Sequence, residues 1–356
     1  MIWHGVISWI RLRSPQVVRT VARRVRPVLV WAGIVALSIA LISVFVFFVG
    51  PSSPADQVVW GVNFSQKFAS GLQVDWRAAY LAILDDLRPA HIKVLTAWDD
   101  IETEPGVLSF DSMDFELDQA RVYGADVVLV IGMKTGRWPE CHLPDWAKPL
   151  TKEEQQARVL GLLEAFVVRY RTHPALAAWQ VENEAMFPFG DCPWYDTAFL
   201  RREAELVKRL DPSRPVVVTD SGELSLWWQA ATIGDVVGTT LYRTAWFNEL
   251  DRELTYPLPP VFYGRKAWLV KQLFGKPVWN VELQAEPWGR SLLYNLPLEE
   301  QRTLMTPEKF NAIISYARKT GLNTFYLWGA EWWYAMKTVH ADSGMWDAAR
   351  KLFQEE

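Results

Sequence analysis

Two glutamates that each end a short apolar run are the residues best suited to chemistry in this sequence. Glu184 closes the run at 179–184 (Trp-Gln-Val-Glu-Asn-Glu), and Glu282 closes the run at 277–282 (Pro-Val-Trp-Asn-Val-Glu). A carboxylate at the end of a buried strand usually points into a cleft rather than into bulk water. Two carboxyl groups, one donating a proton and one attacking the anomeric carbon, cleave a glycosidic bond with retention of configuration. The pair therefore predicts chemistry on a sugar.

This chemistry needs the two carboxyl groups in different protonation states. Glu184, as the proton donor, needs a pKa raised by partial desolvation and a nearby negative charge. Glu282, as the nucleophile, has to be ionised. Retention predicts carboxyl groups about 5–5.5 Å apart, whereas inversion needs about 6.5–9.5 Å. The competing interpretation is that both glutamates are ordinary ion-pair partners.

Strands and helices alternate along the body of the chain and must position these glutamates. From residue 58, short β-branched runs are separated by longer amphipathic stretches, which is typical of a parallel sheet with crossover helices. The expected strands are 58–64, 91–96, 126–131, 175–181, 215–219, 236–241, 277–281 and 323–327. Eight such units in about 300 residues suit a closed (β/α)8 TIM barrel. A doubly wound open sheet is the alternative, but no G-x-G-x-x-G follows the first strand.

In such a barrel the carboxyl ends of the strands meet at one face, which holds the site. Glu184 ends the expected fourth strand and Glu282 the expected seventh, so they should face each other. At this point the sequence resembles the retaining glycoside hydrolases of the (β/α)8-barrel clan that includes cellulases, β-mannanases and β-galactosidases. The resemblance implies that Glu184 is the acid/base, that Asn183 hydrogen-bonds the sugar 2-hydroxyl, and that Glu282 is the nucleophile.

Further positions match the same clan and suggest substrate contacts. Trp98 stands in a segment after the second strand that is similar to several of its families. Tyr242, ending the sixth strand, matches a tyrosine that hydrogen-bonds the nucleophile, and Trp328, ending the eighth, matches a tryptophan that floors the first subsite. Glu331 follows the eighth strand and could bond sugar hydroxyls or cap a loop. Candidate stacking platforms in the predicted mouth loops are Trp138, Trp332 and Trp333.

Other positions depart from the clan. Lys93 stands where an arginine often contacts the nucleophile, and lysine lacks the planar two-pronged geometry of arginine. Thr240 replaces a histidine found in some families. Glu286, just beyond the seventh strand, is an alternative nucleophile. Glu182 points to the opposite side of its strand from Asn183 and is expected to be structural. The family within the clan is not assigned.

The N-terminal region predicts a single membrane anchor. Residues 28–49 are free of charge and proline and are long enough to span a bilayer as a transmembrane helix. Residues 1–27 carry all the arginines before it, so the positive-inside rule places them in the cytoplasm. A linker at 50–57 then leads to the barrel domain at 58–356, which is expected outside the cytoplasm, at the cell membrane. A cleaved signal peptide is the competing interpretation, although its apolar region is normally shorter.

The two cysteines of the chain are expected to pair. Cys141 and Cys192 each lie in a proline-containing loop just after a predicted strand. If those strands are neighbours, the loops touch, and a disulfide could persist outside the cell. Two unpaired buried thiols are the alternative.

Composition narrows the classes of function. Of 37 basic and 41 acidic residues, six arginines and no acid fall in residues 1–55, so the remainder carries about −10. We therefore expect no nucleic-acid partner. The five scattered histidines and the lack of a G-x-S-x-G elbow argue against a metal site and a serine nucleophile, and no cofactor is expected. Lys134 and Arg137 could meet a charged sugar, but surface solvation is the expected state.

These observations predict a membrane-anchored, extracytoplasmic retaining glycosidase acting on an oligo- or polysaccharide. The alternative is a catalytically inactive barrel that binds cell-surface or extracellular glycans. The lysine at position 93 favours the binder, whereas the presence of both glutamates favours the enzyme. The sugar, the linkage, endo or exo action and the oligomeric state are left open by the sequence.

Overall fold

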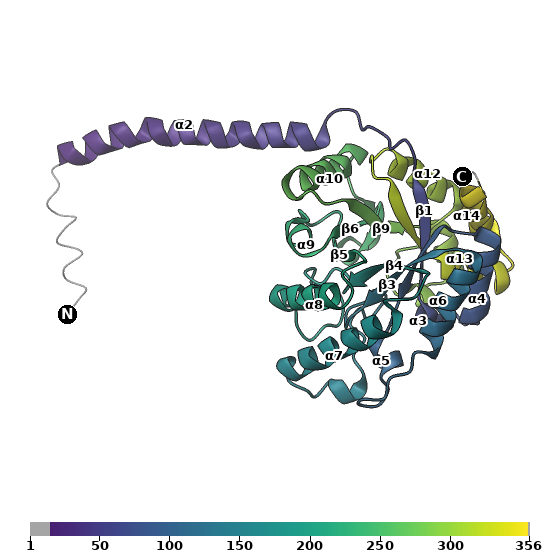
Figure 1. Cartoon of the computed structure of the whole chain (residues 1–356). Coiled ribbons are helices and arrows are strands. Elements are labelled where there is room, and N and C mark those ends of the chain that lie inside the picture. Colours follow the sequence, from purple (N-terminus) through teal and green to yellow (C-terminus); the bar gives the residue numbers. More distant parts are fainter. Residues whose placement is uncertain (1–14, 355–356) are drawn as a thin grey trace. The chain divides into compact units, whose positions relative to one another are not determined.

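The structure, a computed structural model, describes residues 15–354 of the 356-residue chain. It contains two compact units, residues 1–51 and residues 52–356. The expected cytoplasmic segment 1–27 lies largely outside the described residues. Of the two units, the second carries the barrel and all the candidate site residues (Figure 1).

The first unit contains one long helix, α2 (Pro15–Phe48). Its stretch Val25–Phe48 is 24 residues long with a mean hydropathy of 2.6, and none of it is buried by protein. By length and composition this stretch could cross a membrane, and a signal sequence near an N-terminus has the same properties.

The second unit is built on a closed barrel of eight parallel strands, in the order β1-β10-β9-β6-β5-β4-β3-β2. The strands are β1 (Val59–Phe64), β2 (His91–Leu95), β3 (Asp126–Ile131), β4 (Leu176–Val181), β5 (Val216–Asp220), β6 (Val236–Leu241), β9 (Val278–Gln284) and β10 (Thr324–Trp328). The predicted (β/α)8 barrel is therefore confirmed. The seventh and eighth strands of the prediction are β9 and β10.

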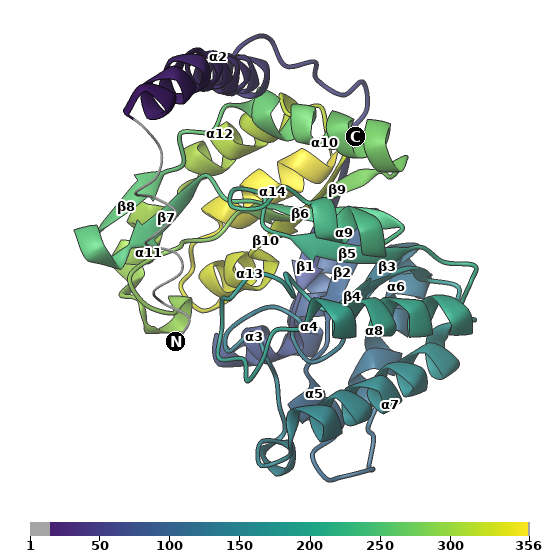
Figure 2. The same cartoon turned by 90° about the vertical axis from the view of Figure 1, so that its left-hand side faces the viewer.

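Helices surround the barrel, as the strand–helix alternation predicts (Figure 2). They are α3 (Gln66–Gly71), α4 (Trp76–Ala82) with a π-helical turn (Ile83–Leu87), α5 (Trp98–Ile101), α6 (Asp111–Tyr123), α7 (Lys152–Tyr170), α8 (Thr197–Leu210), α9 (Trp228–Ile233), α10 (Pro260–Phe274), α11 (Leu298–Leu304), α12 (Pro307–Arg318), α13 (Ala330–Thr338) and α14 (Gly344–Gln354). Helices α7, α8 and α12 begin at side-chain caps, as in the capping box of Thr151 and Glu154 at the start of α7.

Several short elements were not expected from the sequence. They include α3, α5, α11, α13 and a two-stranded antiparallel hairpin of β7 (Thr244–Phe247) and β8 (Arg252–Thr255). The hairpin follows β6, at the carboxyl-end face of the barrel. These elements lie in the loops, where periodicity gives little signal, and they shape the surroundings of the site.

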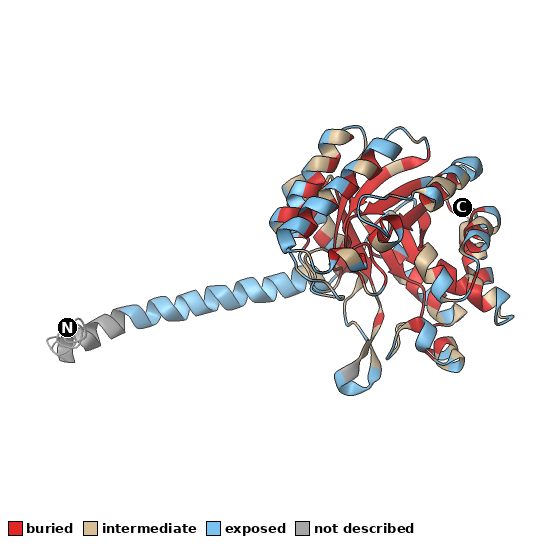
Figure 3. Ribbon diagram, turned by 90° about the horizontal axis from the view of Figure 1, so that it is seen from below, coloured by how far each residue is buried: buried red, intermediate tan, exposed pale blue. Residues whose placement is uncertain are grey.

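The core consists of the barrel interior and the inner faces of the helices, while the outer helix faces are exposed (Figure 3). Valines, leucines and isoleucines of the strands are almost completely buried, as both faces of a parallel sheet require. Six tryptophans have no exposed surface: Trp60, Trp98, Trp179, Trp227, Trp333 and Trp346.

The boundary predicted for the seventh strand was wrong. Strand β9 continues to Gln284, so Glu282 lies within the strand rather than at its end. The extension is stabilised by the amide of Gln284, whose oxygen accepts from the backbone N–H groups of Arg243 and Thr244. Such a contact with the start of the hairpin joins residues 40 positions apart, so periodicity along the chain does not predict it.

Candidate active site

Glu282 lies on β9 with two donors to its carboxylate. The hydroxyl of Tyr242, just after β6, donates to one oxygen at 3.0 Å. The ammonium of Lys93, on β2, lies 3.4 Å from the other oxygen. Lys93 has no exposed surface and Glu282 is 4% exposed. Donors from β2 and from the end of β6 therefore converge on this one carboxyl group.

Lys93 itself is costly to bury. Burial lowers the pKa of its ammonium, and the attraction of Glu282 only partly opposes that effect. The pair therefore contributes little net stability by itself, because removing two charges from water costs more than their attraction returns. A buried lysine kept against this cost points to a role in the site rather than in the stability of the fold.

Glu184 follows β4 in a backbone conformation that L-residues seldom adopt, with φ of 44°. Its N–H donates to the hydroxyl of Thr219 on β5 at 2.7 Å. The hydroxyl of Thr240, on β6, lies 3.4 Å from the carboxyl oxygen Oε1 of Glu184. Thr240 is also the register partner of Glu282 in the neighbouring strand β9. The two glutamates are therefore brought to the same side of the barrel mouth around Thr240.

The electrostatic surroundings of Glu184 favour its protonated form. Burial raises the pKa of Glu184 well above the ordinary glutamate value, and the negative charges of Glu282 and Glu140 raise it further. Lys134 acts in the opposite direction. Residue 184 keeps some exposed surface, as a proton donor that must meet a substrate requires. The surroundings of Glu184 are thus those of a carboxyl group that keeps its proton.

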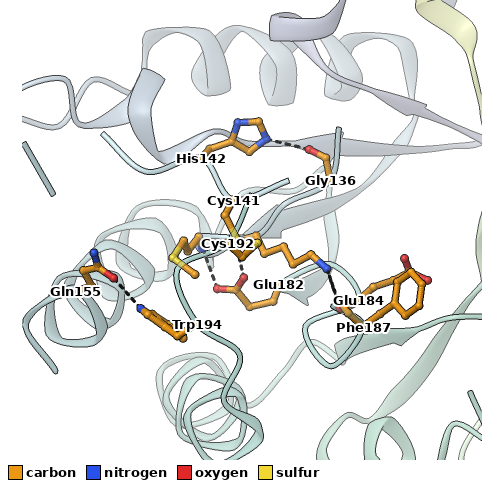
Figure 4. Close-up of a disulfide and its surroundings, with 11 residues drawn as sticks. Gly136, Cys141, His142, Gln155, Glu182, Glu184, Phe187, Cys192 and Trp194 are labelled. Atoms are coloured by element: carbon orange, nitrogen blue, oxygen red, sulfur yellow. Dashed lines mark hydrogen bonds between the residues drawn. A yellow bond between two sulfur atoms is a disulfide. The ribbon is translucent and has the colours of Figure 1, made fainter. Parts of the chain in front are cut away.

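The backbone around Glu184 is held by Lys134 and a disulfide (Figure 4). The ammonium of Lys134 donates to the carbonyl oxygens of Glu184 and Phe187, both at 2.9 Å. Cys141 and Cys192 form the predicted disulfide, with an S–S distance of 2.03 Å. The bridge joins the loop after β3 to the loop after β4, beside Glu184. The prediction of the disulfide is confirmed.

Glu182 is structural, as its position on the strand predicted. Its carboxylate accepts from the backbone N–H groups of Met133 at 2.8 Å and Lys134 at 2.5 Å. It therefore joins the end of β4 to the loop that follows β3. Burial raises the pKa of Glu182 despite these bonds, and Glu203 of α8 lies beside it as a second buried carboxyl group.

Asn183 is 2% exposed and points toward the mouth of the barrel. Its carbonyl oxygen accepts from the amide of Gln180 at 2.9 Å, which fixes the orientation of the side chain. A Cβ added at Gly136 would meet the amide nitrogen of Asn183 at 3.4 Å and the indole of Trp328 at 3.3 Å. Gly136 also has φ of +89°, so glycine is required there for two reasons. The asparagine and tryptophan implied by the clan resemblance therefore lie close together.

Arg137 and Lys134 were expected to be solvated, and this expectation was wrong. Arg137 is only 7% exposed and Lys134 only 2% exposed. The guanidinium of Arg137 donates to Glu286, and to Glu331 at 3.0 Å. It stacks between Phe68, 3.6 Å from the ring centroid, and Trp328, at 4.1 Å. Trp328 is thus covered on one side by a cation.

Glu286 and Glu331 are occupied by this arginine. Burial raises the pKa of Glu286 to about 7, although Arg137 opposes the rise. Glu331 is wholly buried and also accepts from the backbone N–H of Ser65 at 2.7 Å. Between the two possibilities for Glu331, this contact places it as a loop-capping carboxylate. Glu282, with a lysine and a tyrosine aimed at it, is better placed for attack than Glu286.

The other predicted tryptophans divide into exposed and buried ones. Trp138 is 48% exposed and lies against Phe189, with ring centroids 6.3 Å apart, so it remains a candidate platform. Trp98 has no exposed surface and donates to Glu102 at 2.7 Å. Trp332 and Trp333 are 1% and 0% exposed. These last three pack inside the protein, which corrects the prediction that Trp332 and Trp333 stack on sugar and leaves Trp98 behind the site.

Two acidic residues near the pair were missed by sequence reasoning. Glu140, next to the disulfide, is buried, and its burial raises the pKa to about 8, with Glu282 adding to the rise. Glu223 follows β5; its carboxylate accepts from the N–H of Tyr242 at 2.9 Å and the hydroxyl of Tyr263 at 2.7 Å. The sequence did carry a signal for each residue: Glu140 precedes a cysteine, and Glu223 follows an expected strand. Together they add two buried carboxyl groups to the mouth.

Comparisons with known proteins find similarity in structure but not in sequence. No protein-family model matches the chain, and no curated protein is detectably similar to it in sequence. In structure, the chain is similar to a GH5_18 protein from Streptomyces cattleya in complex with GlcNAc, with 18% identity, 78% of this chain and 71% of that chain covered, and a TM-score of 0.55.

Two further solved structures share the fold. One is a β-galactosidase from the Antarctic haloarchaeon Halorubrum lacusprofundi, at 15% identity and a TM-score of 0.57, with 83% of this chain and 58% of that chain covered. The other is endo-glycoceramidase II from Rhodococcus sp., solved as a lactosyl-enzyme intermediate, at 15% identity and a TM-score of 0.50, with 78% and 75% covered. The resemblance to barrel-fold glycoside hydrolases is confirmed at the level of the fold, and the family stays unassigned.

Proposed function

We propose that this chain is a retaining glycoside hydrolase in which Glu184 is the acid/base and Glu282 the nucleophile. The observation that carries the proposal is the contrast between the two carboxyl groups. Glu282 accepts from Tyr242 and lies beside the ammonium of Lys93, while burial and neighbouring carboxylates raise the pKa of Glu184. Pairs of titratable groups whose surroundings favour opposite states identify acid and base roles.

The reaction follows from these states. Glu184 donates its proton to the leaving glycosidic oxygen while Glu282 attacks the anomeric carbon and forms a glycosyl ester. Glu184, now a carboxylate, takes a proton from the water that hydrolyses this ester. The endo-glycoceramidase caught as a lactosyl-enzyme intermediate supports such an ester for this fold. The spacing of about 5–5.5 Å that this course needs stays a prediction.

The substrate is proposed to be an oligo- or polysaccharide. Two structural neighbours of the GH5_18 type were solved with GlcNAc and with Manβ1-4GlcNAc, which supports a carbohydrate ligand for the fold. The contacts proposed for the sugar are Asn183, Trp138 and the part of Trp328 that Arg137 leaves open. No cofactor takes part in this mechanism.

We further propose that α2 anchors the protein in the cell membrane, with the N-terminus in the cytoplasm and the barrel outside. Val25–Phe48 has the length and hydropathy for a membrane span. The arginines precede it, and the positive-inside rule then sets the orientation. The disulfide supports an oxidising location for the barrel.

The test is covalent labelling of the residue 52–356 body with 2-deoxy-2-fluoroglycosyl fluorides across a panel of sugars. We expect one adduct, located at Glu282 by peptide mass spectrometry. Glu282→Gln should abolish the adduct, and Glu286→Gln is the matched control that should retain it. Glu184→Gln should slow turnover of aryl glycosides with poor leaving groups by about 10²–10⁴-fold.

Three results would contradict the proposal. An adduct on Glu286 would reassign the nucleophile. Inverted stereochemistry of the product, followed by NMR, would exclude the glycosyl ester. Sugar binding without labelling or turnover across the panel would favour the inactive glycan-binding barrel.

A further inference from the structure

Large apolar side chains are exposed on the outer face formed by α9 and α10. Trp228 on α9 is 58% exposed and Trp268 on α10 is 59% exposed. Leu273 on α10 and Leu226, just before α9, are exposed at 55% and 81%. The two helices lie side by side in both views (Figures 1 and 2), and Trp228 contacts Phe274 edge-on at 4.8 Å. We call this surface the α9–α10 face.

Such a surface needs an explanation, because soluble proteins rarely expose large apolar side chains in groups. The inner side of α10 already packs on the barrel through buried residues, including Val261, Tyr263 and Val270. Trp268 is therefore an additional apolar residue on the side that faces away from the core, and Leu273 is exposed in the last turn of the same helix.

The charge of this face is opposite to that of the rest of the unit. Residues 254–281 contain four basic residues and no acid, whereas the chain after residue 55 carries about −10; of the four, Lys266 is buried and does not contribute to the face. Arg265 and Lys271 are exposed on α10 beside Trp268. On the neighbouring α8, Arg201 donates to the carbonyl of Thr232 at the end of α9. Tryptophan and leucine among arginine and lysine are the composition that binds the interface of an anionic bilayer.

The point at which the chain enters the barrel favours a membrane as the partner of the α9–α10 face. Residues 49–58 join α2 to β1, and ten residues reach at most about 35 Å. Val59 pairs with Asn323 at the amino end of the strands, so the connection arrives there. The end of α10 leads into β9, which is two strands from β1 through β10. Strands are about 4.8 Å apart, so the end of α10 lies on the side of the barrel that the connection from α2 enters.

We propose that the α9–α10 face binds the anionic lipid surface of the membrane in which α2 is anchored. Trp228, Trp268 and Leu273 insert at the level of the lipid headgroups, and Arg265 and Lys271 contact the headgroup phosphates. The proposal rests on the proposed membrane anchor but not on the glycosidase activity. Contact along this face would fix the orientation of the barrel on the membrane. It would therefore determine how the mouth of the barrel meets glycans near the membrane.

The experiment uses the residue 52–356 body, which has a closed barrel and a core of its own and lacks α2. Sedimentation with vesicles of phosphatidylglycerol and phosphatidylcholine should show binding that weakens from 20 to 300 mM salt. Vesicles of phosphatidylcholine alone should bind much less. Changing both Arg265→Gln and Lys271→Gln should lower the partition coefficient about 25-fold, since each basic residue near the surface contributes about five-fold.

The apolar contribution is tested by Trp228→Ser with Trp268→Ser, which should weaken binding at least ten-fold. The matched control is Val122→Ser with Tyr123→Ser on α6, two exposed apolar residues at 63% and 42% on another helix, which should leave binding unchanged. No binding to anionic vesicles at 20 mM salt, or equal losses in test and control variants, overturns the proposal. So does a dimer in sedimentation velocity that Trp268→Ser dissolves, because the partner would then be a second copy.

Whether α2 anchors the chain in the membrane is tested in a separate experiment. The full chain should remain in the membrane pellet after carbonate extraction whether or not the α9–α10 face binds lipid. Aryl glycoside hydrolysis by the soluble body reports on the active site independently of both. A body that binds vesicles but hydrolyses nothing would refute the proposed function and support this inference.

Discussion

Replacing Lys93 with methionine removes one charge from the buried pair and leaves the other. At 3.4 Å and an effective dielectric constant of about 20, the attraction between Lys93 and Glu282 is about 5 kcal/mol. Burial of Lys93 outweighs the attractions that act on its ammonium, since its pKa is lowered overall. The intact pair is therefore close to neutral for stability, but Lys93→Met leaves the carboxylate of Glu282 buried with Tyr242 as its donor. We expect a loss of about 3–5 kcal/mol at pH 7.

The measurement is a double-mutant cycle by urea unfolding of the residue 52–356 body. In the Glu282→Gln background no buried anion is left, so Lys93→Met should be neutral or stabilising, which gives a coupling energy of about 3 kcal/mol or more. Lys266→Met is the matched control. Lys266 is also buried but donates to the carbonyls of Gly222 and Ser225, so its cost should add to that of Glu282→Gln within about 0.5 kcal/mol.

Activity gives a second measurement on the same variants. Lys93→Met should reduce kcat/KM for aryl glycosides, because the attacking carboxylate loses its neighbouring charge, and part of the loss should be restored by Lys93→Arg. If Lys93→Met costs the same in both backgrounds and leaves kcat/KM unchanged, then Lys93 is only a filler of the barrel interior. The reasoning that assigns it to the nucleophile would then be wrong.

Three other predictions concern the same region. The pH profile of kcat/KM should fall on its alkaline side as Glu184 loses the proton that it must donate, and Glu184→Gln should remove that limb; a limb that persists would assign the acid elsewhere. Glu140 has a pKa of about 8 when folded, so its protonated form favours the folded state below pH 4.5, and this contribution is lost as pH rises through 8. Glu140→Gln should therefore reduce the loss of unfolding free energy between pH 5 and pH 9, by at most about 5 kcal/mol, and equal pH dependence of wild type and variant would contradict this. The disulfide closes a loop of 51 residues, so Cys141→Ser with Cys192→Ser should lower the free energy of unfolding by about 4 kcal/mol, measured by denaturant titration; a loss below 1 kcal/mol would show that the loops hold without it.

The barrel was predictable because its signal lies in local patterning. Each buried strand is a short β-branched run, and each major helix carries an apolar stripe and a cap or stop residue, such as Thr151 before α7 and Gly124 after α6. Once eight such units are counted, the strand ends converge by topology. Glu184 and Glu282 could therefore be assigned to one face without any knowledge of side-chain contacts.

The electrostatic neighbours of the pair were harder to predict. Arg137 and Lys134 were expected in solvent because charged residues usually are, yet both are buried where loops after β3 fold back over the mouth. Trp332 and Trp333 were expected at the mouth, but α13 turns them into the core. Loop residues are placed by contacts between distant segments, and one sequence has no periodic pattern that reports those contacts.

The sequence by itself determined the order of the strands along the chain, the two candidate carboxyl groups, the pairing of the cysteines and the apolar N-terminal helix. Each of these depends on local spacing, on composition, or on the fixed topology of a parallel barrel. Only the tertiary structure decided which cation faces which acid: Lys93 and Tyr242 at Glu282, Arg137 between Glu286 and Glu331, and the carboxylates that raise the pKa of Glu184. The physical reason is that charge interactions depend on distance and burial in three dimensions, and both are set by loops whose course the sequence pattern leaves open.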